Sequence, residues 1–105
     1  MPDFSKIFEQ AQQMQQRMQQ VQSELEKQTV TAAAGGGMVT VEADGKGTIT
    51  RVKIDPSVAD PKDVEMLEDL VLVAVNEAQK KAAELAKSEM SRLAGGLNLP
   101  FKLPF

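Results

Sequence analysis

Residues 38–54 read MVTVEADGKGTITRVKI, and the alternation within this stretch decides the fold. Apolar or small side chains occupy every second position on each side of an Asp-Gly pair, which is the pattern of two strands that bury one face. Asp-Gly between such strands predicts the tight turn of a β-hairpin. We expect the buried face to carry Val39, Val41, Val52 and Ile54.

The length of the hairpin loop sets the pairing of the two strands. A four-residue loop, Asp44 to Gly47, places Val41 opposite Thr50 and Val39 opposite Val52, and a two-residue loop keeps the same faces. A three-residue loop would turn the apolar set of one strand into water. Either even loop length therefore predicts the same buried face.

A long helical pattern and a short strand precede the hairpin. Apolar residues recur at steps of three and four over about three heptads. This seam consists of Phe4, Ile7, Ala11, Met14, Met18, Val21 and Leu25. Residues 29–34 then alternate weakly and lead into three glycines, which predicts a first strand and a permissive turn.

A second helical pattern follows the hairpin. Asp60 is expected to be its N-cap, Pro61 its first residue, and Gly95-Gly96 its end. The predicted fold is therefore α+β, with the order α-β-β-β-α: a three-stranded antiparallel sheet flanked by two long helices. At about 1.5 Å per residue the helices are longer than the strands, so we expect both to protrude beyond the sheet.

The chain is expected to form a single domain over residues 1–96, followed by a Pro- and Phe-containing tail over residues 97–105. The tail reads LNLPFKLPF, which is too interrupted by proline for a helix or a strand. Either it packs across its own domain or a sister chain, or it is an apolar hook left for another partner.

The composition excludes several classes of function. The 105 residues contain no cysteine and no histidine, so the usual zinc ligands, general base and thiol nucleophile are missing. We expect no enzyme, metal, cofactor or small-molecule substrate, and we interpret the acidic residues of the second helix as complements to its dipole. No apolar run approaches membrane-spanning length and no secretion signal is evident, so a cytoplasmic protein without a membrane partner is expected.

The first half of the second helix is apolar nearly all round, which predicts a second copy. Three strands and two helices cannot cover the apolar circumference between Leu67 and Val75, so we infer a homodimer whose protruding helices form a clamp-like particle. The expected interface residues are Val39, Val41, Val52, Leu67, Leu70, Val71 and Val75.

Charge is distributed unevenly along the chain. Residues 55–75 carry one basic and six acidic groups, whereas residues 76–105 carry five basic and three acidic groups. The geometry of the protruding helices predicts that basic residues lie near their tips and the acidic belt near the sheet. The residues expected at the tips are Lys6, Lys80, Lys81, Lys87 and Arg92. The alternative is that neighbouring glutamates pair with these bases on a solvated helix face.

Four segments together resemble the YbaB/EbfC family of small bacterial nucleoid-associated proteins. These are QAQQMQQRMQ in the first helix, VKIDPS at the end of the hairpin, EMLEDLV followed by AVNEA, and the ending GLNLPFKLPF. The resemblance implies a cofactor-free α-β-β-β-α homodimer, tweezer-like in shape, that binds double-stranded DNA with low or modest sequence specificity and affects nucleoid organisation and gene expression. It implies DNA contacts on the helical arms, at Lys6, Arg17, Lys80, Lys81, Lys87, Arg92 and Lys102.

A function of a different class is also compatible with the sequence. Helices with adaptable methionines and an apolar tail can hold other proteins, as expected of a chaperone-like or adaptor protein with a helix-hairpin-helix plan. Salt separates the two functions, because DNA binding weakens as salt rises whereas apolar binding holds or strengthens.

Overall fold

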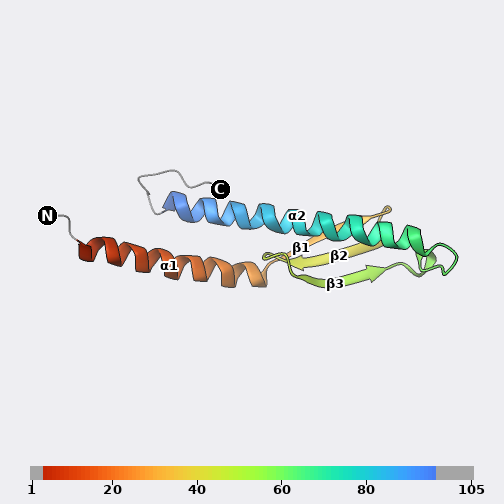
Figure 1. The fold of residues 1–105 in the computed structure, drawn as a ribbon, viewed down its shortest axis with the longest axis horizontal. Helices are drawn as coiled ribbons and strands as arrows, with labels where there is room; N and C mark the ends of the chain where they lie inside the picture. Colours follow the sequence, from red (N-terminus) through yellow and green to blue (C-terminus); the bar gives the residue numbers. More distant parts are fainter. Residues whose placement is uncertain (1–3, 97–105) are drawn as a thin grey trace.

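The computed structural model of the protein describes residues 4–96, and the side chains of residues 4–93. The helices and strands are α1 (Phe4–Lys27), β1 (Thr29–Ala34), β2 (Val39–Asp44), β3 (Ile49–Ile54) and α2 (Val64–Gly96), with a 3-10 turn at Pro56–Val58. The strands form one antiparallel sheet in the order β1-β2-β3 (Figure 1). The predicted α-β-β-β-α fold is confirmed, and the predicted tail lies outside the described residues.

The core lies between one face of the sheet and the first half of α2. Val39, Val41 and Ala43 of the central strand β2 are completely buried, and Ala74 and Ala78 of α2 are buried against them. Alanine on the helix lets its backbone approach the sheet closely, while the branched valines fill the space between the layers at the density of a protein interior. This packing fixes the direction in which α2 crosses the sheet.

The pairing of β2 with β3 differs from the one predicted. The structure pairs Val41 with Val52 and Val39 with Ile54. The predicted partners were Thr50 for Val41 and Val52 for Val39. The faces are nevertheless the predicted ones, because directly paired residues of antiparallel strands point to the same side.

A three-residue loop and a β-bulge together account for the shift. The N–H of Asp44 donates to the carbonyl of Thr48 over 2.9 Å, so the loop consists of residues 45–47, and Gly47 adopts a positive φ of 92°. Such a loop alone would reverse one strand's faces. The register shift beside Glu42 and Ala43 leaves Thr50 as an extra residue on β3, and this bulge restores the buried face.

The second helix begins later than predicted. α2 starts at Val64, and the Asp63 carboxylate accepts the N–H of Met66 over 3.2 Å, so Asp63 rather than Asp60 is the N-cap. The Asp60 carboxylate instead accepts the N–H of Lys62 over 2.9 Å within a separate turn. Both aspartates fit the N-cap pattern, and the sequence alone does not separate them.

Both helices extend beyond the sheet, as predicted. α2 crosses the sheet and continues antiparallel beside α1, so the start of α1 and the end of α2 lie at the same end of an elongated molecule measuring 74 × 21 × 16 Å (Figure 1). The predicted seam of α1 is covered only from Met14 onward. Leu25 is buried and Met18 and Val21 are half-buried, whereas Phe4 and Ile7 are exposed.

β3 receives little cover from α2, which packs mainly on β1 and β2. Val52 and Ile54 therefore remain 44% and 37% exposed, although they share the face of the fully buried Val39 and Val41. β3 is thus an edge strand whose apolar face is only partly covered by the described residues 4–96.

Candidate functional site

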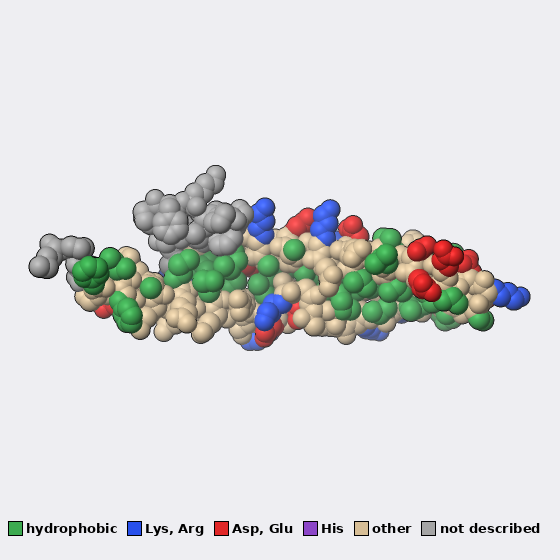
Figure 2. All heavy atoms as spheres, viewed as in Figure 1, with side chains coloured by type: hydrophobic (Ala, Val, Ile, Leu, Met, Phe, Trp, Pro, Cys, Tyr) green, Lys and Arg blue, Asp and Glu red, His purple; other side chains and the backbone are tan. Residues whose placement is uncertain are grey.

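The predicted cations of the arms lie on different parts of the structure. Lys6 is exposed near the start of α1, Lys87 is exposed on the part of α2 beyond the sheet, and Lys102 lies outside the described residues. On the face drawn in Figure 2, the Lys and Arg side chains are dispersed along the molecule and interspersed with acidic ones. No single basic patch covers this face.

The two helices bring Arg17 and Arg92 to one hollow. This hollow of about 280 Å³ lies between α1 and α2 and is also lined by Glu24 and Glu89. Arg92 donates to the Glu89 carboxylate over 3.0 Å, yet its side chain remains 74% exposed. Within residues 4–96 the structure records no hydrogen bond or ion pair for the Arg17 side chain. Two guanidinium groups from separate helices therefore border the same exposed depression.

Lys81 does not lie at an arm tip, contrary to the prediction. Its Nζ donates to the carbonyl of Thr31 in β1 over 2.8 Å, and the side chain of nearby Gln79 donates to the carbonyl of Gly47 over 3.3 Å. Lys80 and Lys81 thus stand where α2 leaves the sheet. The prediction placed both lysines too far from the sheet. The 17 residues of α2 before Lys81 span about 26 Å, and this length of the helix lies over the sheet and its turns.

Lys81 also shields the outer edge of the sheet. The N–H of Asp55 donates to the carbonyl of Met38 over 2.8 Å, which fixes the phase of the ladder. Hydrogen-bonded pairs alternate along the ladder, so the backbone N–H and carbonyl of Glu42 point toward β3. The carbonyl of Thr31, which pairs with Glu42 on the other side, therefore points away from β2 to the outer edge. A lysine on an edge carbonyl discourages pairing with a further strand. A lysine side chain therefore caps a carbonyl at the β1 edge of the sheet. Among the described residues, the structure records no such cap on β3.

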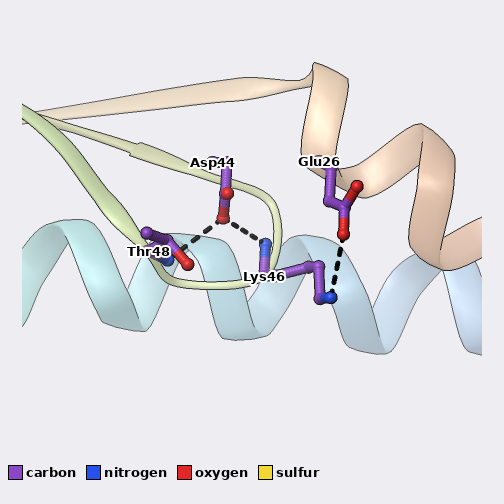
Figure 3. A network of polar contacts seen from close by, with 4 residues as sticks. All are labelled: Glu26, Asp44, Lys46 and Thr48. Atoms are coloured by element: carbon purple, nitrogen blue, oxygen red, sulfur yellow. Dashed lines mark hydrogen bonds and ion pairs between the residues drawn. The ribbon is translucent and has the colours of Figure 1, made fainter.

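The hairpin turn holds the sheet end of α1 (Figure 3). The N–H of Gly45 donates to the carbonyl of Leu25 over 2.8 Å, and Lys46 Nζ pairs with Glu26 Oε1 over 3.0 Å. The Asp44 carboxylate in turn accepts the N–H groups of Lys46 and Thr48. The role of Lys46 was not predicted, because its partner Glu26 lies 20 residues earlier in the chain. The only local signal was the tight Asp-Gly turn.

The acidic belt lies at the opposite end of α2 from the overhang (Figure 2). Within it, the N–H of Ser57 donates to the Asp55 carboxylate over 2.9 Å, and this hydrogen bond lowers the pKa of Asp55. The described residues contain neither a cluster of three or more potential metal ligands nor a helix long and apolar enough to cross a membrane. The described overhang carries both signs, with Lys6, Arg17, Lys87 and Arg92 beside Glu9, Glu84 and Glu89, so the excess of acid lies at the sheet end of α2.

An apolar hollow of about 500 Å³ runs between β3 and α2. It is lined by Ile54, Leu67, Glu68, Val71, Leu72 and Val75. Figure 2 shows hydrophobic side chains gathered over this half of the molecule. Of the predicted interface residues, Leu67, Val71 and Val75 reach this surface.

The other predicted interface residues are divided between this surface and the interior. Val52 is exposed beside the hollow on β3, and Leu70 is half-buried against the core. Val39 and Val41, however, are completely buried beneath α2 of their own chain. Their side chains are therefore core and are not available to a second copy. The reason is that α2 covers β2, which the alternation of the strand could not reveal.

Comparison with known proteins identifies relatives across the whole length of the chain. The profile of the YbaB/EbfC DNA-binding family matches residues 1–97. A nucleoid-associated protein of Gemmatimonas aurantiaca is 52% identical over 98% of this chain and 99% of its own, and one of Granulibacter bethesdensis is 48% identical over the full length of both. The crystal structure of an uncharacterized Helicobacter pylori protein, 26% identical, superposes with a TM-score of 0.82 over 90% of this chain and 100% of its own.

Proposed function

The chain belongs to the YbaB/EbfC DNA-binding family, and from that premise we propose that it binds double-stranded DNA as a homodimer through the overhanging parts of α1 and α2. Membership, together with the names of its relatives, supports a nucleoid-associated, DNA-binding role. We place the protein on the nucleoid in the cytoplasm, where it affects nucleoid organisation and gene expression. It is proposed to act without a cofactor and without enzymatic activity.

The juxtaposition of Arg17 and Arg92 is the observation that carries this location of the contacts. Guanidinium groups bind phosphate oxygens through two parallel N–H bonds, and most protein–DNA hydrogen bonds go to the phosphate and sugar backbone. Two arginines bordering one hollow can contact neighbouring phosphates. Lys6 and Lys87 extend the cationic surface along the overhang, whereas Lys81 is occupied at the sheet edge.

Affinity is expected to be modest and specificity low. The overhang offers four described cations, Lys6, Arg17, Lys87 and Arg92, so the logarithm of affinity should fall against the logarithm of salt with a slope of at most roughly −4 per protomer. The formal net charge of the chain, −3, opposes the approach to DNA at longer range. We recognise no base-reading set of side chains on the described parts of α1 and α2, so we propose that preference arises from DNA shape and the spacing of the arms.

The dimer is proposed to form through the hollow between β3 and α2. This surface combines exposed Val52 and Leu72 with the half-buried Leu67, Val71 and Val75. Lys81 caps a carbonyl at the opposite edge of the sheet, so we place the second copy on the side of β3. Burial of this surface stabilises the pair by roughly 25 cal/mol per Å² of apolar area removed from water. The overhanging helices of both copies would then project from one central body.

A salt series with fluorescent duplex DNA tests the proposed function. We expect anisotropy to report binding at about 50 mM salt that weakens steeply toward about 200 mM, with tighter binding to the duplex than to either separated strand. Binding that holds or strengthens as salt rises would instead indicate apolar contact, as expected for a chaperone-like or adaptor protein. That result, or equal affinity for duplex and single strands, contradicts the proposal.

A further inference from the structure

The free end of α1 exposes a cluster of large apolar side chains. Phe4, Ile7 and Phe8 are 73%, 57% and 64% exposed, and their spacing of three and four residues places them on one side of the helix. Ala11, one turn further along, is exposed on the same side. We call these four residues the apolar tip. Clustered exposed apolar side chains of this size mark an interaction surface.

The apolar tip continues the face of α1 that packs against α2. Leu93 of α2 lines the same hollow as Arg17 and Val21, and the two helices run antiparallel. Three further residues end α2 at about the level of residues 14–18 of α1. From there α1 continues toward its start for roughly 15–20 Å without α2 beside it, as Figure 1 also shows. The interface between the two helices therefore passes into an exposed surface of the same character.

The charges around the apolar tip favour a second copy of the chain as its partner. The positions that border it are the uncharged Ser5, Gln10 and Gln12, whereas Lys6 and Glu9 lie on the opposite side of α1. A border without charge offers no selectivity for a cationic or an anionic partner. It also lets two identical surfaces meet without repulsion between like charges.

The sizes of the side chains suit an antiparallel pair of tips. α2 covers α1 from Met14 onward, so a second α1 helix reaches the tip only from the open end, with its own tip first. Centred between Ile7 and Phe8, this pairing is symmetric. It places Phe4 of each copy at the level of Ala11 of the other. The bulkiest side chain then meets the smallest one at both ends of the contact, which lets the helices approach closely.

We propose that the apolar tips of two protein molecules pack against each other in this antiparallel arrangement. The three large side chains expose roughly 400 Å² per copy, so the pair buries less than the roughly 1,000 Å² of a stable interface. The contact is therefore weak and forms at high protein concentration. On the proposed homodimer, each pair of chains carries two tips, which join neighbouring dimers held on one DNA. That consequence rests on the proposed function, whereas the tip contact does not.

Small-angle X-ray scattering of the full-length protein without DNA tests the contact. We expect the average mass to rise as the protein concentration increases from the micromolar toward the millimolar range. Phe4→Ser with Phe8→Ser should reduce this rise at least several-fold, because both side chains are exposed and their loss leaves the protomer folded. Lys6→Ser with Glu9→Ser, on the opposite side of α1, should leave it unchanged. A mass independent of concentration, or the same rise with and without the tip substitutions, overturns the proposal.

Disulfide trapping tests the same contact by its geometry. The protein has no cysteine, so Phe8→Cys introduces a single thiol at the apolar tip. Under mild oxidation we expect a product of two linked chains that forms several-fold faster than with Glu9→Cys. Equal rates would mean random collision and would contradict the tip contact. Neither measurement uses DNA, so a failure of the salt series would leave both results in place.

Discussion

At the scale of single residues, Gly45 determines how α1 joins the sheet. A Cβ atom at this position would lie 2.7 Å from the carbonyl oxygen and 3.0 Å from the Cα of Leu25. The backbone of α1 cannot retreat easily, because Leu25 is itself buried and accepts the N–H of Gly45. Glycine is therefore required here by close approach, whereas Gly36 is required only by its positive φ of 66° in an open turn.

Substitution of Gly45 by alanine is expected to loosen this junction. Gly45→Ala should lower the free energy of unfolding by about 1–3 kcal/mol, the usual effect of overpacking a tight contact. Gly36→Ala is the comparison variant: nothing lies within 4 Å of its added methyl group, so it measures only the cost of alanine at a positive φ, which Gly45→Ala does not incur. Chemical denaturation of the two variants should show the larger loss for Gly45→Ala. The reverse order would mean that the contact with Leu25 is unimportant.

At the scale of elements, hydrophobic periodicity predicted which segments become helix and strand, while local geometry escaped it. The alternation around Val41 was correct in outline, whereas the seam ending at Leu25 is covered only over its second half. The β2–β3 register depended on a bulge at Thr50, which arises from the turn type rather than from the pattern of the strand. The exit point of α2 at Lys81 depended on how far the sheet extends beneath the helix.

The candidate site was predictable only as a list of cations. The sequence indicated which basic residues lie on the two helices, but the meeting of Arg17 with Arg92 requires the antiparallel alignment of α1 and α2. Likewise, the apolar stretch of α2 predicted an interface, but only the packing separates the buried Val39 and Val41 from the exposed Val52. Both the meeting of the two arginines and the division between core and exposed valines depend on contacts between segments that are distant in the sequence.

The hollow between α2 and β3 is expected to control association. Leu72 is 60% exposed in the single chain, so Leu72→Asp should leave the protomer folded while placing a charge in the proposed apolar interface. Sedimentation equilibrium should give the mass of two chains for the natural sequence and of one chain for this variant. Val64→Asp, at an exposed apolar position outside the hollow, serves as the control. A dimer that survives Leu72→Asp argues against this interface.

At the scale of the whole molecule, length is the feature that connects the fold to its function. The protein extends over 74 Å but is only 21 and 16 Å across, because α1 and α2 continue together beyond a small sheet. Acidic residues collect at the sheet end of α2, and the arginine pair lies on the overhang. The acidic end is repelled from DNA more strongly than the nearly neutral overhang, which supports the proposed approach with the helical arms foremost.

Duplex affinity of an arm variant tests this account most directly. Arg17→Gln with Arg92→Gln should weaken binding at low salt by about tenfold or more, since each charge-assisted phosphate contact contributes roughly 1 kcal/mol or more. Lys53→Gln with Lys62→Gln removes the same charge from the sheet end and should change the affinity by less than about twofold, because those lysines make no phosphate contact. Equal losses in the two variants, or no loss from the arginine pair, would contradict DNA binding through the arms.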